Sequence, residues 1–412
     1  MRKGNLRGIV PYPFTNARMR RESIGVHTTT STATVKSDIA LRPRAERLVS
    51  LDVFRGFVIA FMILVNDPGD GPSSYWPLKH AEWNGWTPTD LVFPSFLFIV
   101  GVAMAFSNRS RMAAGQTRST LLKHAAWRGI VLFAIGLLLN GLGARYHFGH
   151  WRVYGVLQRI AICYVITAAL ELWTDWRAQI ALAIACLTAY WILMRYVAVP
   201  GFGIPTQDIP LLDPDRNLVA WLDRKVLAGH LYEGTRDPEG LISTIPAIAT
   251  SLLGLLTGKW LRTQYAPRVK TFGMIGAGVA AIILGKVMDL WFPINKKLWT
   301  SSYVVFTAGL ALICLALCYW IVDVRRHRGG WTWPILVFGM NAIAAYIFSE
   351  TLAVALYGLS VGGNTLMGHI YASAFAPLAT PANASLLYAL SYVILCWVVM
   401  AGLYRKGIFL KI

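Results

Sequence analysis

Long, uninterrupted apolar blocks run through this chain of 412 residues and constrain its fold more than any other feature. One of them, "LVFPSFLFIVGVAMAF", contains no charged residue. Charged residues make up 14% of the chain, whereas soluble domains carry about 25%. A stretch of about 20 mostly apolar residues is long enough to cross a bilayer as a helix. The blocks therefore predict a polytopic membrane protein.

The expected fold is all-α, a transmembrane helical bundle of about ten spans, because a helix satisfies its own backbone hydrogen bonds in lipid. Residues 47–412 are expected to form this transmembrane domain, with one long outer loop at about 200–240. The spans are expected at roughly 48–66, 90–107, 125–142, 154–173, 178–199, 241–260, 271–291, 299–322, 334–356 and 385–404.

Basic residues are distributed unevenly across these predicted spans. Residues 1–46 are polar, basic and rich in Ser and Thr, which predicts a disordered tail. If this tail is cytoplasmic, 25 Lys and Arg fall on its side of the membrane and nine on the other. The positive-inside rule then places both termini in the cytoplasm. The net charge of +19 therefore indicates membrane orientation and not nucleic-acid binding.

Polar side chains within spans are costly, so each is a functional candidate. Asp52 and Arg55 lie three residues apart near the predicted inner end, and Lys286 and Asp289 have the same spacing near the outer end. Mutual neutralisation is the alternative explanation for both pairs. The other candidates are Arg128 on the inner side, Asn341 near the middle, and Asn66, His80, Asp90, Gln158, Arg159 and Glu350 on the outer side.

His80 is the strongest candidate, because it follows one span and precedes another, which brings Asn66 and Asp90 towards the same surface. An imidazole beside a carboxylate is a common general base. An asparagine amide can donate to a developing oxyanion. The nearby tryptophans have an alternative role as an aromatic belt at the membrane interface. The five cysteines fall inside apolar blocks without accompanying histidines, so no metal site is predicted.

Several stretches resemble the catalytic domain of the heparan-α-glucosaminide N-acetyltransferase family and its bacterial relatives. They include "RLVSLDVFRG", "LKHAEWNGWTPTDLVFPSFLFIVG", "FPINKKLWTSSYV" and "FGMNAIAAYIFSE", and the resemblance covers about residues 45–410. It implies a multi-pass acetyltransferase of the bacterial inner membrane that uses cytoplasmic acetyl-CoA. It also implies an amino-sugar acceptor at the outer side, contact with membrane lipid and a homodimer.

The resemblance places the active-site histidine at His80, its partner asparagine at Asn66, and the first-span Asp and Arg at Asp52 and Arg55. We therefore expect three groups of site residues. The catalytic group is His80, Asn66, Asp52 and Asp90. The group expected to hold acetyl-CoA is Arg55, Arg128, Gln158, Arg159, Lys286 and Asn341. The group expected to hold the acceptor is Trp83, Asn84, Trp86 and Glu350.

Two chemical routes and one different function stay open at this point. His80 either removes a proton from the attacking amine or carries the acetyl group covalently. The acceptor is glucosamine or a related amino sugar. The alternative function is an amino-sugar or N-acetylglucosamine permease, in which buried ionisable groups couple proton movement to transport.

Overall fold

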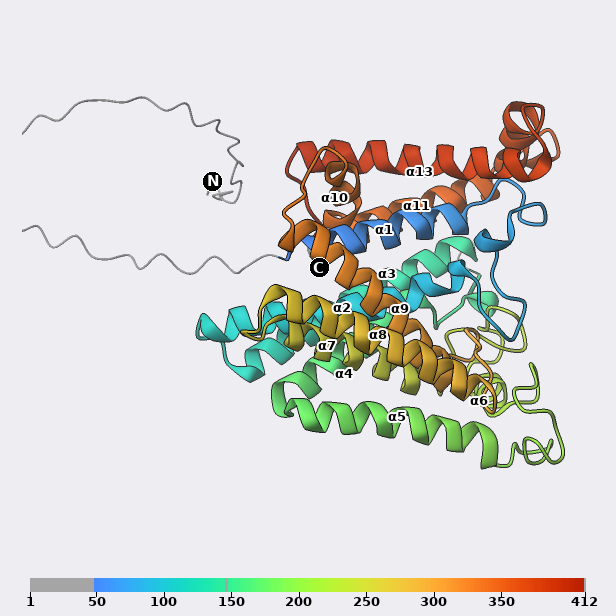
Figure 1. The fold of residues 1–412 in the computed structure, drawn as a ribbon. Coiled ribbons are helices and arrows are strands. Elements are labelled where there is room, and N and C mark those ends of the chain that lie inside the picture. The colour runs from blue at the N-terminus through green and yellow to red at the C-terminus, as the bar shows by residue number, and fades with distance from the viewer. Residues whose placement is uncertain (1–47, 145–146, 411–412) are drawn as a thin grey trace, which may run out of the picture.

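The computed structural model describes residues 48–144 and 147–410 as a bundle of long helices lying side by side (Figure 1). The predictions made for the tail at 1–46 lie outside these residues. The long helices are α1 (Val49–Asn66), α2 (Val92–Ala113), α3 (Arg118–Gly143), α4 (Val156–Trp173), α5 (Trp176–Tyr196), α7 (Thr244–Leu261), α8 (Pro267–Asp289), α9 (Ser301–Cys318) and α13 (Pro381–Arg405).

Eight helices of the described chain are long and apolar enough to cross a membrane, or nine if the bent pair α10–α11 is counted as one span. The predicted helical transmembrane fold is therefore confirmed. Helix α7 is the predicted span that falls outside this set. It is rich in Thr, Ser and Gly, and most of its residues are buried against other helices. Its composition fits helix–helix packing in a membrane, where small residues let backbones approach closely.

The predicted span at 334–356 is not one straight helix. Helix α10 (Thr332–Met340) and helix α11 (Ala342–Gly358) meet at Asn341 with a bend of 80°. Helix α9 also ends irregularly and continues as the π-helical segment η4 (Tyr319–Val324). Bends of this size have a local cause in the hydrogen-bond ladder. Here the side-chain amide of Asn341 donates to Val337 O, 3.3 Å away.

Helix α2 forms the centre of the bundle and α5 and α8 form its outside. The span that contains α2 has 72% of its most apolar window buried, whereas α5 and α8 each have 22% buried. Helices α2 and α7 approach closely at their glycines. A Cβ at Gly101 would lie 2.0 Å from Ser251 O, so only glycine fits there. The outer helices present apolar side chains outward, as lipid contact requires.

The connections that follow α1, α5 and α8 gather at one end of the bundle, the right-hand end in Figure 1. The first contains the 3₁₀ turns η1 (Trp76–Leu78) and η2 (Pro88–Leu91), and the second contains α6 (Leu218–Val226). Three loops far apart in sequence therefore share one surface. The remaining short elements are η3 (Phe148–His150), the antiparallel strands β1 (Ser360–Val361) and β2 (Asn364–Thr365), α12 (Leu366–Ile370) and the π-helical η5 (Tyr371–Phe375).

Candidate active site

His80 and Asp90 are in direct contact. His80 Nδ1 lies 2.7 Å from Asp90 Oδ1, and the His80 side chain is 45% exposed while that of Asp90 is 1% exposed. Because a carboxylate only accepts hydrogen bonds, Nδ1 is the nitrogen that carries the proton. The lone pair is then on Nε2. The predicted pair of a histidine and a carboxylate is thus present, with an accessible imidazole on a buried acid.

The local sequence "TPTD" fixes Asp90 in this position. Thr87 and Asp90 form a capping box at the start of η2, where Thr87 N donates to Asp90 Oδ2 at 2.9 Å. Thr87 Oγ1 and Ala81 N also lie within 3.1 Å of Oδ2. Tyr303 OH donates to the backbone carbonyl of Asp90. Oδ2 is thus hydrogen-bonded to the loop itself, and Oδ1 faces His80.

Lys296 reaches His80 from the loop between α8 and α9, and sequence reasoning missed it. Its Nζ lies 3.0 Å from His80 Nδ1, 3.2 Å from Nε2 and 3.8 Å from Asp90 Oδ1. Burial lowers the pKa of Lys296 and the charge of Lys297 lowers it further, while Asp90 and Glu239 oppose the shift. The available signal was "FPINKKLW", a pair of lysines in a short outer loop.

The same two loops are joined by asparagines. Asn295 Nδ2 donates to Asn84 Oδ1 at 3.2 Å, and Gly85 N donates to Ile294 O at 2.7 Å. The side chain of Asn295 also accepts from Leu298 N at 2.9 Å, which fixes the turn that carries Lys296. Asn84 therefore lies beside the turn that carries Lys296, and its predicted role in binding the acceptor stays a prediction.

The two predicted sugar-stacking tryptophans are packed against protein. Trp83 donates its indole N–H to Leu212 O at 2.9 Å, and Arg236 lies 5.2 Å from its ring centre. The ring of Trp86 packs against Phe306, with 4.8 Å between ring centroids. Trp83 thus connects the His80 loop to the long loop between α5 and α7.

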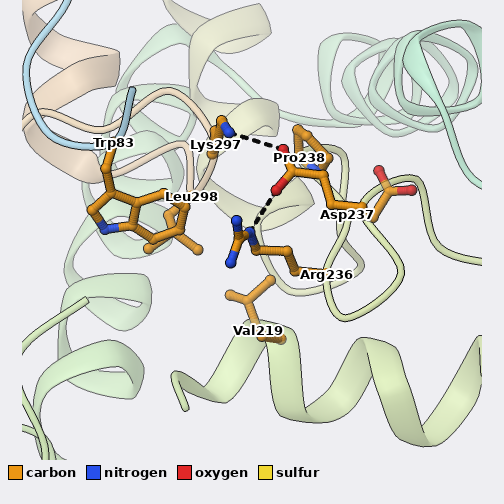
Figure 2. A pocket seen from close by; sticks show the side chains of 9 residues that line it. Trp83, Val219, Arg236, Asp237, Pro238, Lys297 and Leu298 are labelled. Carbon is orange, nitrogen blue, oxygen red and sulfur yellow. Dashed lines mark hydrogen bonds and ion pairs between the residues drawn. The ribbon is translucent and has the colours of Figure 1, made fainter. Parts of the chain in front are cut away.

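Ion pairs hold that long loop over the same end of the bundle. Figure 2 shows Lys297 and Arg236 converging beside Trp83, and both pair with Glu233, at 2.9 and 2.6 Å. Below them, Arg152 binds two carboxylates, Asp237 at 2.5 Å and Glu239. Although burial opposes it, these carboxylates raise the pKa of Arg152. The long loop predicted at about 200–240 is therefore folded and held to the bundle by ion pairs.

Gln158 and Arg159, which were predicted to hold the cofactor, make contacts within the protein. Arg159 is fully buried, donates to Gly240 O at 3.0 Å and lies 5.1 Å from the ring centre of Trp299. Its Nε and Nη1 have no hydrogen-bond partner among the described residues. Gln158 packs against Gly136, where a Cβ would meet it at 2.6 Å. Arg159 thus connects α4 to the end of the long loop between α5 and α7.

The predicted inner residues lie in two separate places. Arg55 pairs with Asp52 at 3.1 Å and donates to Gly339 O at 3.3 Å, two residues before the bend at Asn341. Arg128 donates to Tyr164 OH at 3.0 Å between α3 and α4. Asp52, Arg55 and Asn341 are thus neighbours, and Arg128 is not among them.

Lys286 lies apart from every other candidate. It pairs with Asp289 at 2.6 Å, and its side chain is 53% exposed on α8. The contact is the mutual neutralisation given as the alternative explanation for this spacing, and the predicted role of Lys286 in holding acetyl-CoA stays a prediction.

Asn66 lies at the last turn of α1 and interacts with the carboxylate of Glu350 on α11. Within the described part of the chain, no hydrogen bond joins Asn66 to His80. The next residue, Asp67, is buried, and burial together with Glu350 raises its pKa to about 8. Glu350 thus interacts with both Asn66 and Asp67, which forms a second polar centre that sequence reasoning found only in part. No cluster of three metal-ligating side chains occurs in the described residues.

Comparison with known proteins identifies the family. The family model described as heparan-alpha-glucosaminide N-acetyltransferase, catalytic, matches residues 47–287. The chain belongs to this family. It is 32% identical over 367 residues to the human heparan-alpha-glucosaminide N-acetyltransferase, covering 74% of this chain and 53% of the human protein. The mouse protein of the same name is 31% identical over 374 residues, covering 76% of this chain and 54% of the mouse protein.

A shorter similarity links the chain to an apolipoprotein N-acyltransferase of Nitrosomonas europaea, at 32% identity over 160 residues. That match covers 37% of this chain and 31% of the relative. The chain spans about half the length of the two mammalian relatives. The matched family region contains His80, Asp90, Asn66 and Arg55, whereas Lys296 lies beyond it. The protein is thus a multi-pass membrane protein of an acyl-transfer family.

Proposed function

We propose that this protein transfers an acetyl group from acetyl-CoA to the amine of glucosamine or a related amino sugar, with His80 as the catalytic base. The observation that carries the proposal is the contact of 2.7 Å between exposed His80 and buried Asp90. A buried carboxylate that accepts from Nδ1 leaves the Nε2 lone pair directed at the exposed surface. That is the arrangement in which an imidazole removes a proton from a nucleophile.

In the direct route the acceptor nitrogen attacks the acetyl carbonyl carbon while Nε2 of His80 takes the proton from the amine. The carbon–sulfur bond breaks, and its electron pair leaves on the CoA sulfur. In the covalent route His80 first carries the acetyl group and then passes it to the amine. We favour the direct route, because a base needs only this geometry and a lone pair. Family membership and the similarity to named N-acetyltransferases support acetyl transfer.

The proposed topology places the His80 end at the outer face of the bacterial inner membrane and both termini in the cytoplasm. Acetyl-CoA then enters at the opposite end, where Arg55 with Asp52 at 3.1 Å marks the polar centre nearest the bend at Asn341. A guanidinium group is suited to phosphate. The acceptor approaches His80 from outside, past Asn84 and past the long loop between α5 and α7 that contacts Trp83. Asn66 and Glu350 form a further polar contact for the acceptor or the thioester.

The test uses purified protein in nanodiscs with acetyl-CoA and glucosamine, and it follows the release of free CoA thiol and the formation of N-acetylglucosamine. We expect turnover by the native protein and a loss of about 10²–10⁴-fold in His80→Ala. Full turnover by His80→Ala would rule out the proposed base. Acetylated protein isolated without acceptor would establish the covalent route. Uptake of labelled amino sugar into sealed vesicles without acetyl-CoA, and no thiol release, would identify a permease.

A further inference from the structure

Lys296 is the nearest cation to the proposed base. Its Nζ contacts both ring nitrogens of His80, at 3.0 and 3.2 Å. An ammonium group has three donors and no acceptor. An Nζ at nearly equal distances from both ring nitrogens lies over the face of the imidazole, and not in the ring plane where the Nε2 lone pair points. The ammonium group is therefore beside the proposed base and leaves its lone pair open to the acceptor.

Asp90 has closer partners than Lys296. Its Oδ2 accepts from Thr87 N at 2.9 Å and Ala81 N at 3.1 Å, and its Oδ1 is bound by His80 at 2.7 Å. Lys296 Nζ is 3.8 Å from Oδ1, at the outer limit of an ion pair. Its two shorter contacts are those with the imidazole. The charge is thus directed at the proposed base more closely than at the carboxylate.

Hydrogen bonds within the loop brace the turn that carries Lys296. Trp299 N donates to Lys296 O at 3.0 Å, and Asn295 Oδ1 accepts from Leu298 N at 2.9 Å. The Lys296 side chain is only 20% exposed. The adjacent Lys297 turns away and pairs with Glu233 at 2.9 Å (Figure 2). Two consecutive lysines therefore have different environments, one at the imidazole and one in the outer loop.

We infer that Lys296 is a catalytic residue of the same reaction, whose ammonium group stabilises the negative charge that develops on the thioester oxygen while His80 takes the proton of the amine. This inference rests on the proposed function. When the acceptor amine is bound at Nε2, the ammonium group over the ring lies on the side from which it can contact the carbonyl that the amine attacks. Fixed charge directed at a developing oxyanion lowers the barrier without reorganisation. Lys296 keeps its protons throughout, and the proton of the amine goes to His80.

The inference assigns Lys296 the role that the sequence suggested for Asn66. The Asn66 amide is engaged by Glu350 at the end of α1. An ammonium group beside the imidazole supplies a full positive charge where an amide supplies only a partial one. Lys296 also differs from Arg159, whose guanidinium is fully buried and tied to Gly240 O.

The experiment compares Lys296→Met and Lys296→Arg with Lys297→Met as the matched control, in the thiol-release assay with acetyl-CoA and glucosamine. We expect Lys296→Met to lower kcat by about 10²-fold, the usual effect of removing one oxyanion donor. Lys296→Arg keeps the charge, so it should retain activity within about tenfold of the native protein. Lys297→Met should stay within about twofold, because its ammonium pairs with Glu233.

The pH profile separates catalysis from structure. A required ammonium group makes kcat fall as pH rises through the Lys296 pKa, which burial holds below its usual range. Arginine stays charged at any accessible pH, so this decline should disappear in Lys296→Arg. A Lys296→Met variant with kcat within threefold of the native protein would overturn the inference, as would an unchanged alkaline limb in Lys296→Arg. If His80→Ala is inactive in the same assay while Lys296→Met is active, only this inference fails. If His80→Ala is fully active, the proposed function fails.

Discussion

Replacing Asp90 by asparagine tests the tautomer argument directly. The carboxylate has two separate tasks: Oδ2 accepts from Thr87 N at 2.9 Å and Ala81 N at 3.1 Å, while Oδ1 accepts from His80 Nδ1 at 2.7 Å. In Asp90→Asn the single side-chain oxygen must stay with the two backbone N–H groups. If the amide turned over, its NH₂ group would face these N–H donors, and no acceptor would be left for them. The NH₂ group therefore faces His80. Nδ1 is forced to accept, and the proton moves to Nε2.

This exchange removes the lone pair from the nitrogen that faces the substrates. We expect kcat to fall by about 10²–10⁴-fold, which is the contribution of a correctly placed general base. Stability should change little, because the backbone hydrogen bonds persist. Only the difference between a charge-assisted and a neutral hydrogen bond is lost, on the order of 1 kcal/mol. The binding of acetyl-CoA should be unaffected.

The assay is CoA thiol release by protein in nanodiscs, with the thermal midpoint and the Kd for acetyl-CoA measured on the same samples. The control is Asp213→Asn, which removes a carboxylate from the ion pair of 2.7 Å with exposed Arg216 in the outer loop. We expect the control to keep its activity. An Asp90→Asn variant that retains a third of the native kcat would refute the assignment of Nε2 as the base.

Three further predictions concern the fold and its charges. Gly101→Ala should lower the thermal midpoint by several degrees, because its Cβ would meet Ser251 O at 2.0 Å, whereas Gly276→Ala, with open space around it, should not. Arg152→Ala leaves Asp237 and Glu239 buried without their cation, so the free energy of unfolding should fall by about 3–5 kcal/mol; a change below 1 kcal/mol in chemical denaturation would contradict this. Asp67 has a folded pKa of about 8 against 3.8 for a free carboxyl, so ionisation of the unfolded chain costs stability as pH rises through this range. The thermal midpoint of Asp67→Asn should therefore rise relative to that of the native protein as the pH approaches 8. If the difference between the two midpoints were the same at acidic pH and near pH 8, the raised pKa of Asp67 would be refuted.

Nine of the ten predicted spans coincide with continuous helices because long apolar runs leave the backbone no alternative in lipid. The break at Asn341 was not predicted. Its sequence, "VFGMNAIAA", is as apolar as an unbroken span, so hydropathy does not reveal the bend of 80°. Hydropathy measures the preference of a segment for lipid and does not indicate the direction of its helix axis.

The candidate site was predicted only in part, because sequence reasoning finds contacts within one loop and not contacts between distant loops. His80 and Asp90 are ten residues apart in one loop, so local sequence was enough to bring them together, and the contact of 2.7 Å follows. Lys296 comes from a loop more than two hundred residues later in the chain. Nothing in "NKKLW" distinguishes the lysine that faces the imidazole from the one that faces Glu233. That distinction depends on the turn fixed by Asn295.

The sequence by itself determined that this chain is a bundle of membrane helices and that an imidazole and an acid share one loop, because hydrophobicity and short-range spacing are properties of a linear chain. Only the tertiary structure decided which charges meet. Lys296 contacts His80, and Arg152 pairs with Asp237 of the long loop, although each pair is distant in sequence. The separation of Arg128 from Arg55 likewise depends on how distant helices pack. Electrostatic contacts act over a few ångströms in space, and the order of residues along a chain does not fix those distances.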